Sequence, residues 1–502
     1  MPAAPETLSA STSTATSTST TALSTQSVSA VIVLAAGGGT RMRSSRSKLL
    51  HEIAGHSMLS YAVDAASAVQ PRQVVVVVGH QRDQVEAHLA EIAPHVTIAV
   101  QKEQRGTGHA VQCALAAVED LAGEVLVTLA DVPMLTGETL ADLVAAHRDA
   151  EAGATVMTAV VDDATGYGRI IRDEHDHVSQ IVEHRDASPE QRSVREINSG
   201  IFVFDAELLR SGLDQITADN DQNEFYLTDV VSVARRSGSV VQAHAVADLW
   251  QAEGVNDRVQ LSRMGVEVNR RILDRWMRAG VTVVDPATTW VHASVDLAPD
   301  VTLLPGTSLQ GATSVRSGAV IGPDTTLIDV EVDERATVTR THGSLSMIGP
   351  GASVGPFAFL RPGTVLGAGG KIGTFVETKN TTIGDGAKVP HLTYAGDAVI
   401  GDQANIGAGT IFANYDGVTK STTHIGQSSF VGSNSVLVAP LSIGDGAYVA
   451  AGSTLTGDVA PGQLAVARGQ QRNINGWVAR KRPGTKTARA AEAARAQEEQ
   501  PT

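Results

Sequence analysis

A glycine-rich loop in the first half of the chain is followed by residues that suit phosphate chemistry. Gly37-Gly38-Gly39 comes directly after an apolar stretch, and the basic residues Arg41 and Lys48 follow soon after. Successive glycines let backbone N–H groups approach a polyphosphate, and the two cations add fixed positive charge. The loop lacks the dinucleotide-binding spacing, so its meaning depends on these neighbours. Asp131 ends a second apolar stretch, a position that suits a hard metal ion arriving with a triphosphate.

A second group of polar residues in the later half could move a proton and hold an anion. Acetylating an amine with a thioester requires removal of a proton from the ammonium, and histidine suits this work, which is typically worth a factor of about 10²–10⁴. Arginine and lysine can hold a sugar phosphate. The single cysteine lies in the first half, so direct transfer is favoured over an acyl-cysteine intermediate. The residues are Arg361, Lys379, His391, Tyr394, Asn405, Asn414 and Tyr415.

The first group must be positioned by an α/β domain. Residues 31–36, 74–78, 125–130 and 201–204 form apolar runs typical of buried parallel strands, and helical patterns lie between them, as at 58–69 and 108–121. Alternating strands and helices predict a layered fold that binds ligands at the carboxyl ends of its strands. A charged periodic stretch from 258 to 279 then predicts a connecting helix.

The second group lies within a repeat of six residues. A β-sandwich would not hold one register through so many hexads, whereas a coil with one inward aliphatic on each flat side would. Stacking of such coils then supplies the core. Phase slips near 329–346 and 394–399 indicate inserted loops or corners. The two longest runs are Ile348, Val354, Leu360, Leu366, Ile372 and Thr378, then Ile425, Val431, Leu437, Ile443, Val449 and Leu455, and glycine often follows the aliphatic.

Composition limits the remaining possibilities. The net charge of −15 disfavours nucleic acid and anionic membranes as partners, and no apolar run reaches membrane-spanning length. The lone cysteine, Cys113, excludes an intramolecular disulfide and fits a reducing, cytoplasmic location; a small buried side chain is favoured over a nucleophile there. We expect a disordered Ser/Thr-rich tail over 1–29, an α/β domain over 30–257, a linker helix over 258–280, a coiled domain over 281–479 and a flexible charged tail over 480–502.

The first half resembles the sugar-nucleotide pyrophosphorylases, specifically N-acetylglucosamine-1-phosphate uridyltransferases. The motifs are Leu34-Ala35-Ala36-Gly37, Gln104-Arg105-Gly106-Thr107-Gly108-His109-Ala110, Ala130-Asp131-Val132-Pro133, Thr165-Gly166-Tyr167-Gly168-Arg169-Ile170, Ile181-Val182-Glu183-His184, Glu196-Ile197-Asn198-Ser199-Gly200 and Glu253-Gly254-Val255-Asn256. The resemblance implies a Rossmann-like domain, Mg²⁺ on Asp131 and Asn256, and Arg41 and Lys48 as catalytic cations. It assigns UDP-N-acetylglucosamine binding to Leu34, Ala35, Ala36, Gly37, Lys48, Gln101, Gly106, Thr107, Gly168, Glu183, Asn198 and Asn256, with Gln101, Gly106 and Thr107 at the uracil.

The second half resembles the hexapeptide acyltransferases, in particular the glucosamine-1-phosphate acetyltransferase half of a bifunctional family. This resemblance implies a left-handed parallel β-helix, a homotrimer, and acetyl-CoA sites between neighbouring coils. It assigns proton abstraction to His391. The amino-sugar phosphate is assigned to Arg361, Lys379, Tyr394 and Asn405, and acetyl-CoA to Ala408, Asn414, Tyr415, Ser433, Ala451 and Arg468.

Taken together, these resemblances predict an enzyme that makes UDP-N-acetylglucosamine, a cell-wall precursor, from glucosamine 1-phosphate, acetyl-CoA and UTP. Two departures from the family pattern stand beside this expectation: Ser47 replaces a proline, which would loosen the presentation of Lys48, and Ala130 replaces a glycine, which would crowd the nucleotide. One alternative is a pyrophosphorylase whose coiled domain only assembles or regulates. Another is a non-enzymatic scaffold or sensor that retains both folds.

Overall fold

The computed structural model describes residues 27–118 and 120–498, so most of the tail expected over 1–29 lies outside the described residues. The chain divides into two compact units, Met1–Val268 and Asn269–Thr502. Helix α8 (Arg258–Arg278) occupies the segment expected as a connecting helix. Within the described part of the chain, no helix combines the length and the apolar character that crossing a bilayer requires.

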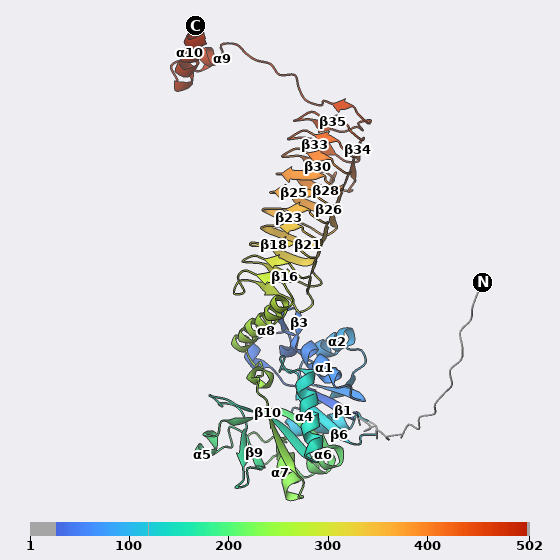
Figure 1. Ribbon diagram of the computed structural model, residues 1–502, viewed down its shortest axis with the longest axis vertical. Coiled ribbons are helices and arrows are strands. Elements are labelled where there is room, and N and C mark those ends of the chain that lie inside the picture. The colour runs from blue at the N-terminus through green and yellow to red at the C-terminus, as the bar shows by residue number, and fades with distance from the viewer. Residues whose placement is uncertain (1–26, 119, 499–502) are drawn as a thin grey trace, which may run out of the picture. The chain divides into compact units, whose positions relative to one another are not determined.

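The first unit is built on one mixed sheet (Figure 1). Strands β1, β4, β5 and β6 run parallel, whereas β10 runs antiparallel to both β6 and β7. The spatial order is β11 (Val241–Ala245), β7 (Ala154–Val160), β10 (Glu196–Asp205), β6 (Glu124–Leu129), β1 (Ala30–Ala35), β4 (Gln73–Val78) and β5 (Thr97–Val100). In addition, β8 (Arg169–Arg172) pairs with β10, and β9 (Val178–Val182) pairs with β8. The expectation that 201–204 is a parallel strand is therefore wrong, because an antiparallel strand buried on both faces has the same apolar pattern.

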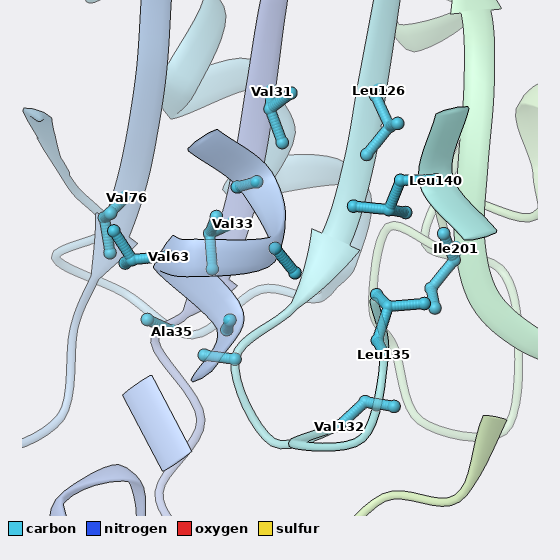
Figure 2. Packing of buried hydrophobic residues seen from close by; sticks show 14 of the residues in the cluster. Val31, Val33, Ala35, Val63, Val76, Leu126, Val132, Leu135, Leu140 and Ile201 are labelled. Carbon is cyan, nitrogen blue, oxygen red and sulfur yellow. The ribbon is translucent and has the colours of Figure 1, made fainter. Parts of the chain in front are cut away.

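Helices cover both faces of this sheet because its strands alternate their side chains between two cores. In β1, Val31, Val33 and Ala35 pack into the cluster that contains residues of α1 (Met58–Ala68), α2 (Arg82–Ile92) and α4 (Gly137–Asp149). Ala30 and Ile32 point the other way, toward α3 (Thr107–Leu115), α6 (Ala206–Leu213) and α7 (Asp229–Arg236). Figure 2 shows the first cluster, in which side chains of β1 meet Val63 and Val76 on one side.

The second unit is a stack of short parallel strands running from β12 (Thr282–Val283) to β37 (Leu464–Ala465) (Figure 1). They form two long parallel ladders of 11 and 15 strands. Four residues of the second polar group lie in β26 (Glu377–Ile383), β27 (Lys388–His391), β28 (Tyr394–Ile400) and β29 (Asn405–Ile406). Arg361 directly follows β23 (Ala358–Leu360), and Asn414 and Tyr415 directly follow β30 (Ile411–Ala413). The segment expected as a flexible tail contains the last two residues of α9 (Trp477–Lys481) and all of α10 (Lys486–Glu498), and the alanine-rich sequence of α10 favours helix.

The hexad residues form the core of the coil. Every member of the two long runs, from Ile348 to Thr378 and from Ile425 to Leu455, is buried. The glycines that follow these aliphatic residues are not explained by a turn of the backbone. At Gly401, for example, a Cβ would lie 2.6 Å from the backbone nitrogen of Gln427 in the next coil. Close stacking of the coils, rather than freedom of φ, therefore requires glycine at this position.

Replacing one inward valine tests whether this stack stabilises the unit. Val431 is fully buried and Val418 is 90% exposed. We expect Val431→Ala to lower the free energy of unfolding by about 2 kcal/mol, since it removes two buried methyl groups and leaves a cavity. The same change at Val418 removes no buried contact. Urea unfolding followed by circular dichroism measures both variants, and equal midpoints would contradict an inward stack.

Candidate active sites

The glycine loop after β1 is held close to Lys48. Gly39 has a φ of 56°, and a Cβ there would lie 2.7 Å from the Cβ of Lys48, so only glycine fits. Lys48 begins the short helix η2 (Lys48–Leu50). The residue before it, Ser47, is buried, and its backbone N–H donates to Oε1 of Gln84 over 2.9 Å. A proline has no N–H, so Ser47 adds a hydrogen bond to this loop, which counters the expected loosening of Lys48.

Two residues from distant parts of the chain, Asp131 and Asn256, contact the ammonium of Lys48. Its Nζ lies 2.5 Å from Oδ2 of Asp131 and donates to Oδ1 of Asn256 over 3.1 Å. Asp131 follows β6, and Asn256 lies just before α8. A carboxylate oxygen and an amide oxygen thus converge on one cation, and these are ligand types that Mg²⁺ accepts together with phosphate and water. Within the described residues, no group of three or more His, Cys, Asp or Glu side chains forms a metal site.

Two adjoining cavities of about 280 Å³ each open around Asp131. They share Leu34, Thr107, Leu129 and Asp131, so they form one continuous cleft, and most of the residues assigned to the nucleotide sugar line it. The lining of the first includes Leu34, Ala35, Ala36, Gly37, Lys48, Gln101, Gly106 and Thr107, and the lining of the second includes Gly168, Glu183, Asn198 and Asn256. Arg41 is exposed and lines a third cavity, which shares Gly166 and Glu183 with the second.

The cleft also contains residues that the sequence did not assign to a role. Gln104 lines the first cavity, and its Nε2 donates to the carbonyl oxygen of Ala36 over 2.6 Å, which ties the loop after β5 to the loop after β1. Tyr167 and Thr228 line the second cavity. Gln104 and Tyr167 belong to recognised motifs, whereas Thr228 lies in none. Ala130 is fully buried in the core cluster and does not line either cavity, so its methyl group does not crowd the cleft as expected.

A partly buried carboxyl lies in the second cavity. Burial raises the pKa of Glu183, and the neighbouring carboxylates of Asp186 and Asp229 raise it further. The hydroxyl of Thr228 donates to Oε1 of Glu183 over 3.4 Å and opposes this rise. A Cβ on Gly168 would lie 3.4 Å from both Glu183 oxygens, so a larger residue there would fill the space beside the carboxyl. Because residue 168 is glycine, the carboxyl oxygens of Glu183 face open space, where they can accept a hydrogen bond from the hydroxyl or amide N–H of a sugar.

In the second unit, one group of polar residues forms a connected network along the coil. Asn414 Nδ2 donates to Oδ2 of Asp397 over 2.5 Å and approaches Tyr394 Oη at 3.4 Å, and Asn380 Nδ2 donates to Oδ1 of Asp397 over 2.8 Å. Burial raises the pKa of Asp397, but these amides and the nearby ammonium groups of Lys379 and Lys420 outweigh burial and hold its pKa below the ordinary value. Asp397 is thus an ionised anchor for the network.

Cations gather beside this network. Lys379 lies close enough to Lys420 to lower the pKa of Lys420, and the guanidinium of Arg361 donates to Glu377 over 2.9 Å. Two ammonium groups side by side repel each other unless an anion lies between them, so this surface favours an anionic ligand. Lys420 was not identified from the sequence, because it lies outside the hexads in the segment 414–421.

The remaining residues of the second set lie on other parts of the coil. His391 ends β27 and Asn405 begins β29, both in the 11-stranded ladder, whereas Lys379 and Tyr394 belong to the 15-stranded one. His391 is exposed, and the turn at Leu392 separates it from Tyr394. Of the residues assigned to acetyl-CoA, Ala408 and Ser433 accept backbone hydrogen bonds from Asn434 and Gly452 in the next coil. Asn414 and Tyr415 begin the 414–421 segment, and Ala451 and Arg468 are exposed.

These two units define a class of protein: a transferase with a nucleotidyltransferase domain followed by a hexapeptide-repeat domain. Residues 31–197 match the MobA-like NTP transferase domain, and residues 422–457 match the bacterial transferase hexapeptide (six repeats), which is the repeat of left-handed β-helices. The chain is 57% identical over 468 residues to the "Bifunctional protein GlmU" of Pseudarthrobacter chlorophenolicus, with 93% of this chain and 95% of that protein covered.

The same name belongs to relatives in Rhodococcus opacus, at 55% identity over 473 residues, and in Corynebacterium efficiens, at 54% over 469 residues. The match covers 93% of this chain in both cases, and 95% and 96% of those proteins. The chain belongs to this GlmU family of bifunctional transferases. Membership confirms the predicted family, fold class and enzyme class, and it disfavours both a scaffold and an enzyme with a single function.

The raised pKa of Glu183 predicts a pH-dependent effect on stability. A carboxyl whose pKa is raised on folding lowers the free energy of unfolding once it ionises. The folded protein is therefore more stable when this carboxyl is neutral. We expect Glu183→Gln to be more stable than the natural protein at pH 7. The difference should fade as the pH falls to the ordinary glutamate range, where Glu183 itself is neutral.

Urea unfolding between pH 4 and pH 7 measures this difference. The control is Glu174→Gln, since Glu174 is exposed in a turn of the same unit. A Glu183→Gln variant that is less stable than the natural protein at pH 7 would contradict the cost of burying this carboxylate.

Proposed function

We propose that the enzyme acetylates glucosamine 1-phosphate with acetyl-CoA and then transfers UMP from UTP to N-acetylglucosamine 1-phosphate. The products are UDP-N-acetylglucosamine and pyrophosphate, which would supply cell-wall precursor synthesis in the cytoplasm. The observation that carries the proposal is the convergence of Lys48, Asp131 and Asn256 in a cleft with room for a nucleotide and a sugar. Membership of a bifunctional family supports pairing this reaction with a second one.

For uridyl transfer, we assign to the cleft the tasks of positioning and charge neutralisation. The phosphate oxygen of the sugar phosphate attacks the α-phosphorus of UTP in line, and pyrophosphate leaves, so no covalent enzyme intermediate is needed. Asp131 and Asn256 would hold Mg²⁺, which neutralises phosphate charge when it is bound. Lys48 and Arg41 stabilise the departing phosphates. Glu183, Asn198 and Gly168 bind the sugar, while Gln101, Gly106 and Thr107 bind the uracil.

For acetyl transfer, we assign the role of general base to His391. Its imidazole takes the proton of the amino group, and the free amine attacks the thioester carbonyl, releasing CoA thiol. The cationic surface of Arg361 and Lys379 binds the sugar phosphate, with Tyr394 and Asn405 at its hydroxyls. Acetyl-CoA lies along the coil axis against Ala408, Asn414, Tyr415, Ser433, Ala451 and Arg468.

The two activities should be separable by single substitutions. We expect His391→Ala to lower acetyl transfer by about 10²-fold or more, because it removes the base, and to leave uridyl transfer unchanged. Asp131→Ala should do the reverse, because it removes a metal ligand. The assay supplies glucosamine 1-phosphate, acetyl-CoA, UTP and Mg²⁺ and follows free thiol and pyrophosphate separately; N-acetylglucosamine 1-phosphate is added when uridyl transfer is measured alone.

His424→Ala is the matched control, since His424 is also exposed in the second unit and is assigned to neither candidate active site. It should retain both activities. Loss of both activities in folded His391→Ala would count against separate sites. A natural protein that releases neither CoA thiol nor pyrophosphate would overturn the proposed function itself.

We also propose that the coiled unit forms a trimer that completes the acetyl-transfer site. His391 lies on the coil surface, and a thioester needs a second wall to be held against it. Next to His391, the exposed side chains of Phe357, Phe375 and Leu392 follow one corner of the coil, and the first two rings stack at 5.4 Å. Such an apolar column favours contact with another copy.

A charge placed in this column tests the trimer. We expect Phe375→Glu to give monomers in sedimentation velocity and to lose acetyl transfer, because burying an unpaired carboxylate opposes assembly. Phe375→Leu keeps an apolar side chain and should remain a trimer. Uridyl transfer is the internal control for folding. Full acetyl transfer by a monomeric variant would refute completion of the site by a neighbour.

A further inference from the structure

A histidine next to the cleft contacts the residue assigned to the uracil. Gln101 follows β5, its side chain is buried, and it lines the first cavity. Its Nε2 lies 3.0 Å from the carbonyl oxygen of Gly106 and 3.1 Å from Nδ1 of His109. His109 lies in the first turn of α3, one turn before Cys113, whose Sγ is 3.7 Å from His109 Nε2. His109 does not line the cavity itself.

Counting hydrogens fixes the orientation of the Gln101 amide. A carbonyl oxygen accepts and never donates, so the atom facing Gly106 must be the amide nitrogen. That nitrogen has two hydrogens and no acceptor capacity. One hydrogen goes to Gly106, and the second is directed at His109. Within the described part of the chain, no donor meets the Gln101 oxygen, which is the amide atom left for a ligand in the cavity.

The same count fixes the form of His109. Nδ1 must accept the second amide hydrogen, so it has no proton, and Nε2 therefore has one. Nε2 then donates weakly to the sulfur of Cys113. The backbone of Gln101 is also fixed, since its N–H donates to Val78 over 2.8 Å. The terminal amide rotation decides which amide atom faces the cavity, and the contacts with Gly106 and His109 both oppose a half turn.

We propose that His109 is a positioning residue that holds the Gln101 oxygen toward the nucleotide and so makes the cleft select uracil over cytosine. The inference rests on the proposed function, because it concerns the base of the nucleotide substrate. A uracil ring presents an N–H at N3, which an amide oxygen accepts. A cytosine ring presents an unprotonated N3, which repels that oxygen.

Without His109 the amide loses its second acceptor. The terminal torsion of glutamine has two broad minima related by a half turn. With Gly106 left as the one acceptor for the amide nitrogen, the orientation that presents NH₂ to the cavity loses one of the two contacts that oppose it. That orientation matches N3 of cytosine and repels N3–H of uracil. Loss of the histidine should therefore change selectivity more than chemistry, because the phosphates and the attacking sugar phosphate lie elsewhere in the cleft.

The test compares His109→Leu with His109→Asn, using UTP and CTP in turn with N-acetylglucosamine 1-phosphate and Mg²⁺ and measuring pyrophosphate. Leucine removes the acceptor, and asparagine can return an oxygen near the position of Nδ1. We expect His109→Leu to lower the ratio of kcat/KM for UTP to that for CTP by about tenfold, mainly through a higher KM for UTP. His109→Asn should restore most of the ratio.

Further controls separate positioning from folding. Cys113→Ala removes the contact at Nε2 but leaves Nδ1 as an acceptor, so it should keep the natural ratio. Acetyl transfer by the same samples should stay unchanged. An unchanged UTP-to-CTP ratio in His109→Leu, or an equal loss in the leucine and asparagine variants, would overturn the inference. Failure of the natural protein to release pyrophosphate from UTP would instead overturn the proposed function.

Discussion

The ammonium of Lys48 is the contact on which the first site depends. It joins a loop after the first strand to Asp131 and Asn256, which lie far along the chain. The side chains of Lys48 and Asp131 are only 10% and 22% exposed, and a charge withdrawn from water is costly unless it is paired. This pairing therefore fixes the glycine loop, the end of β6 and the entry to α8 against one another. The two cavities lined by the other residues that we assign to the nucleotide adjoin this point.

Stacking imposes a different constraint on the second site. Successive coils lie so close that a side chain at one corner meets its counterpart on the next, as the chain Asn380–Asp397–Asn414 illustrates. Functional residues are therefore placed by register along the coil axis rather than by strand ends at one edge of a sheet. A coil surface is convex, so it displays polar groups well but encloses little. A neighbouring copy would supply the missing wall, which is the physical reason for linking acetyl transfer to assembly.

Much of the fold and the candidate site could be predicted because both domains repeat a simple rule. Apolar runs placed β1, β4 and β6 to within one residue, and hexads placed the inward core. The direction of β10 could not be read, because burial on both faces hides it. The phase slips at 329–346 and 394–399 are corners with positive φ at Asp329, Leu345 and Asp397. The segment 414–421 lies outside the hexads, so nothing in their period pointed to Lys420.

Residues that act through others are the hardest to recognise from sequence. Ser47 looked like a weakened position, yet its N–H makes a bond that proline cannot make, and Ala130 looked crowded, yet it faces the core. His109 is a further example, because the role that we propose for it depends on which ring nitrogen faces Gln101. That is set by the folded geometry and not by the sequence motif. An overall charge of −15 also hides the local cations that we assign to the anionic substrates. The proposed specificity therefore depends on where single donors and acceptors point, which spacing along a chain does not encode.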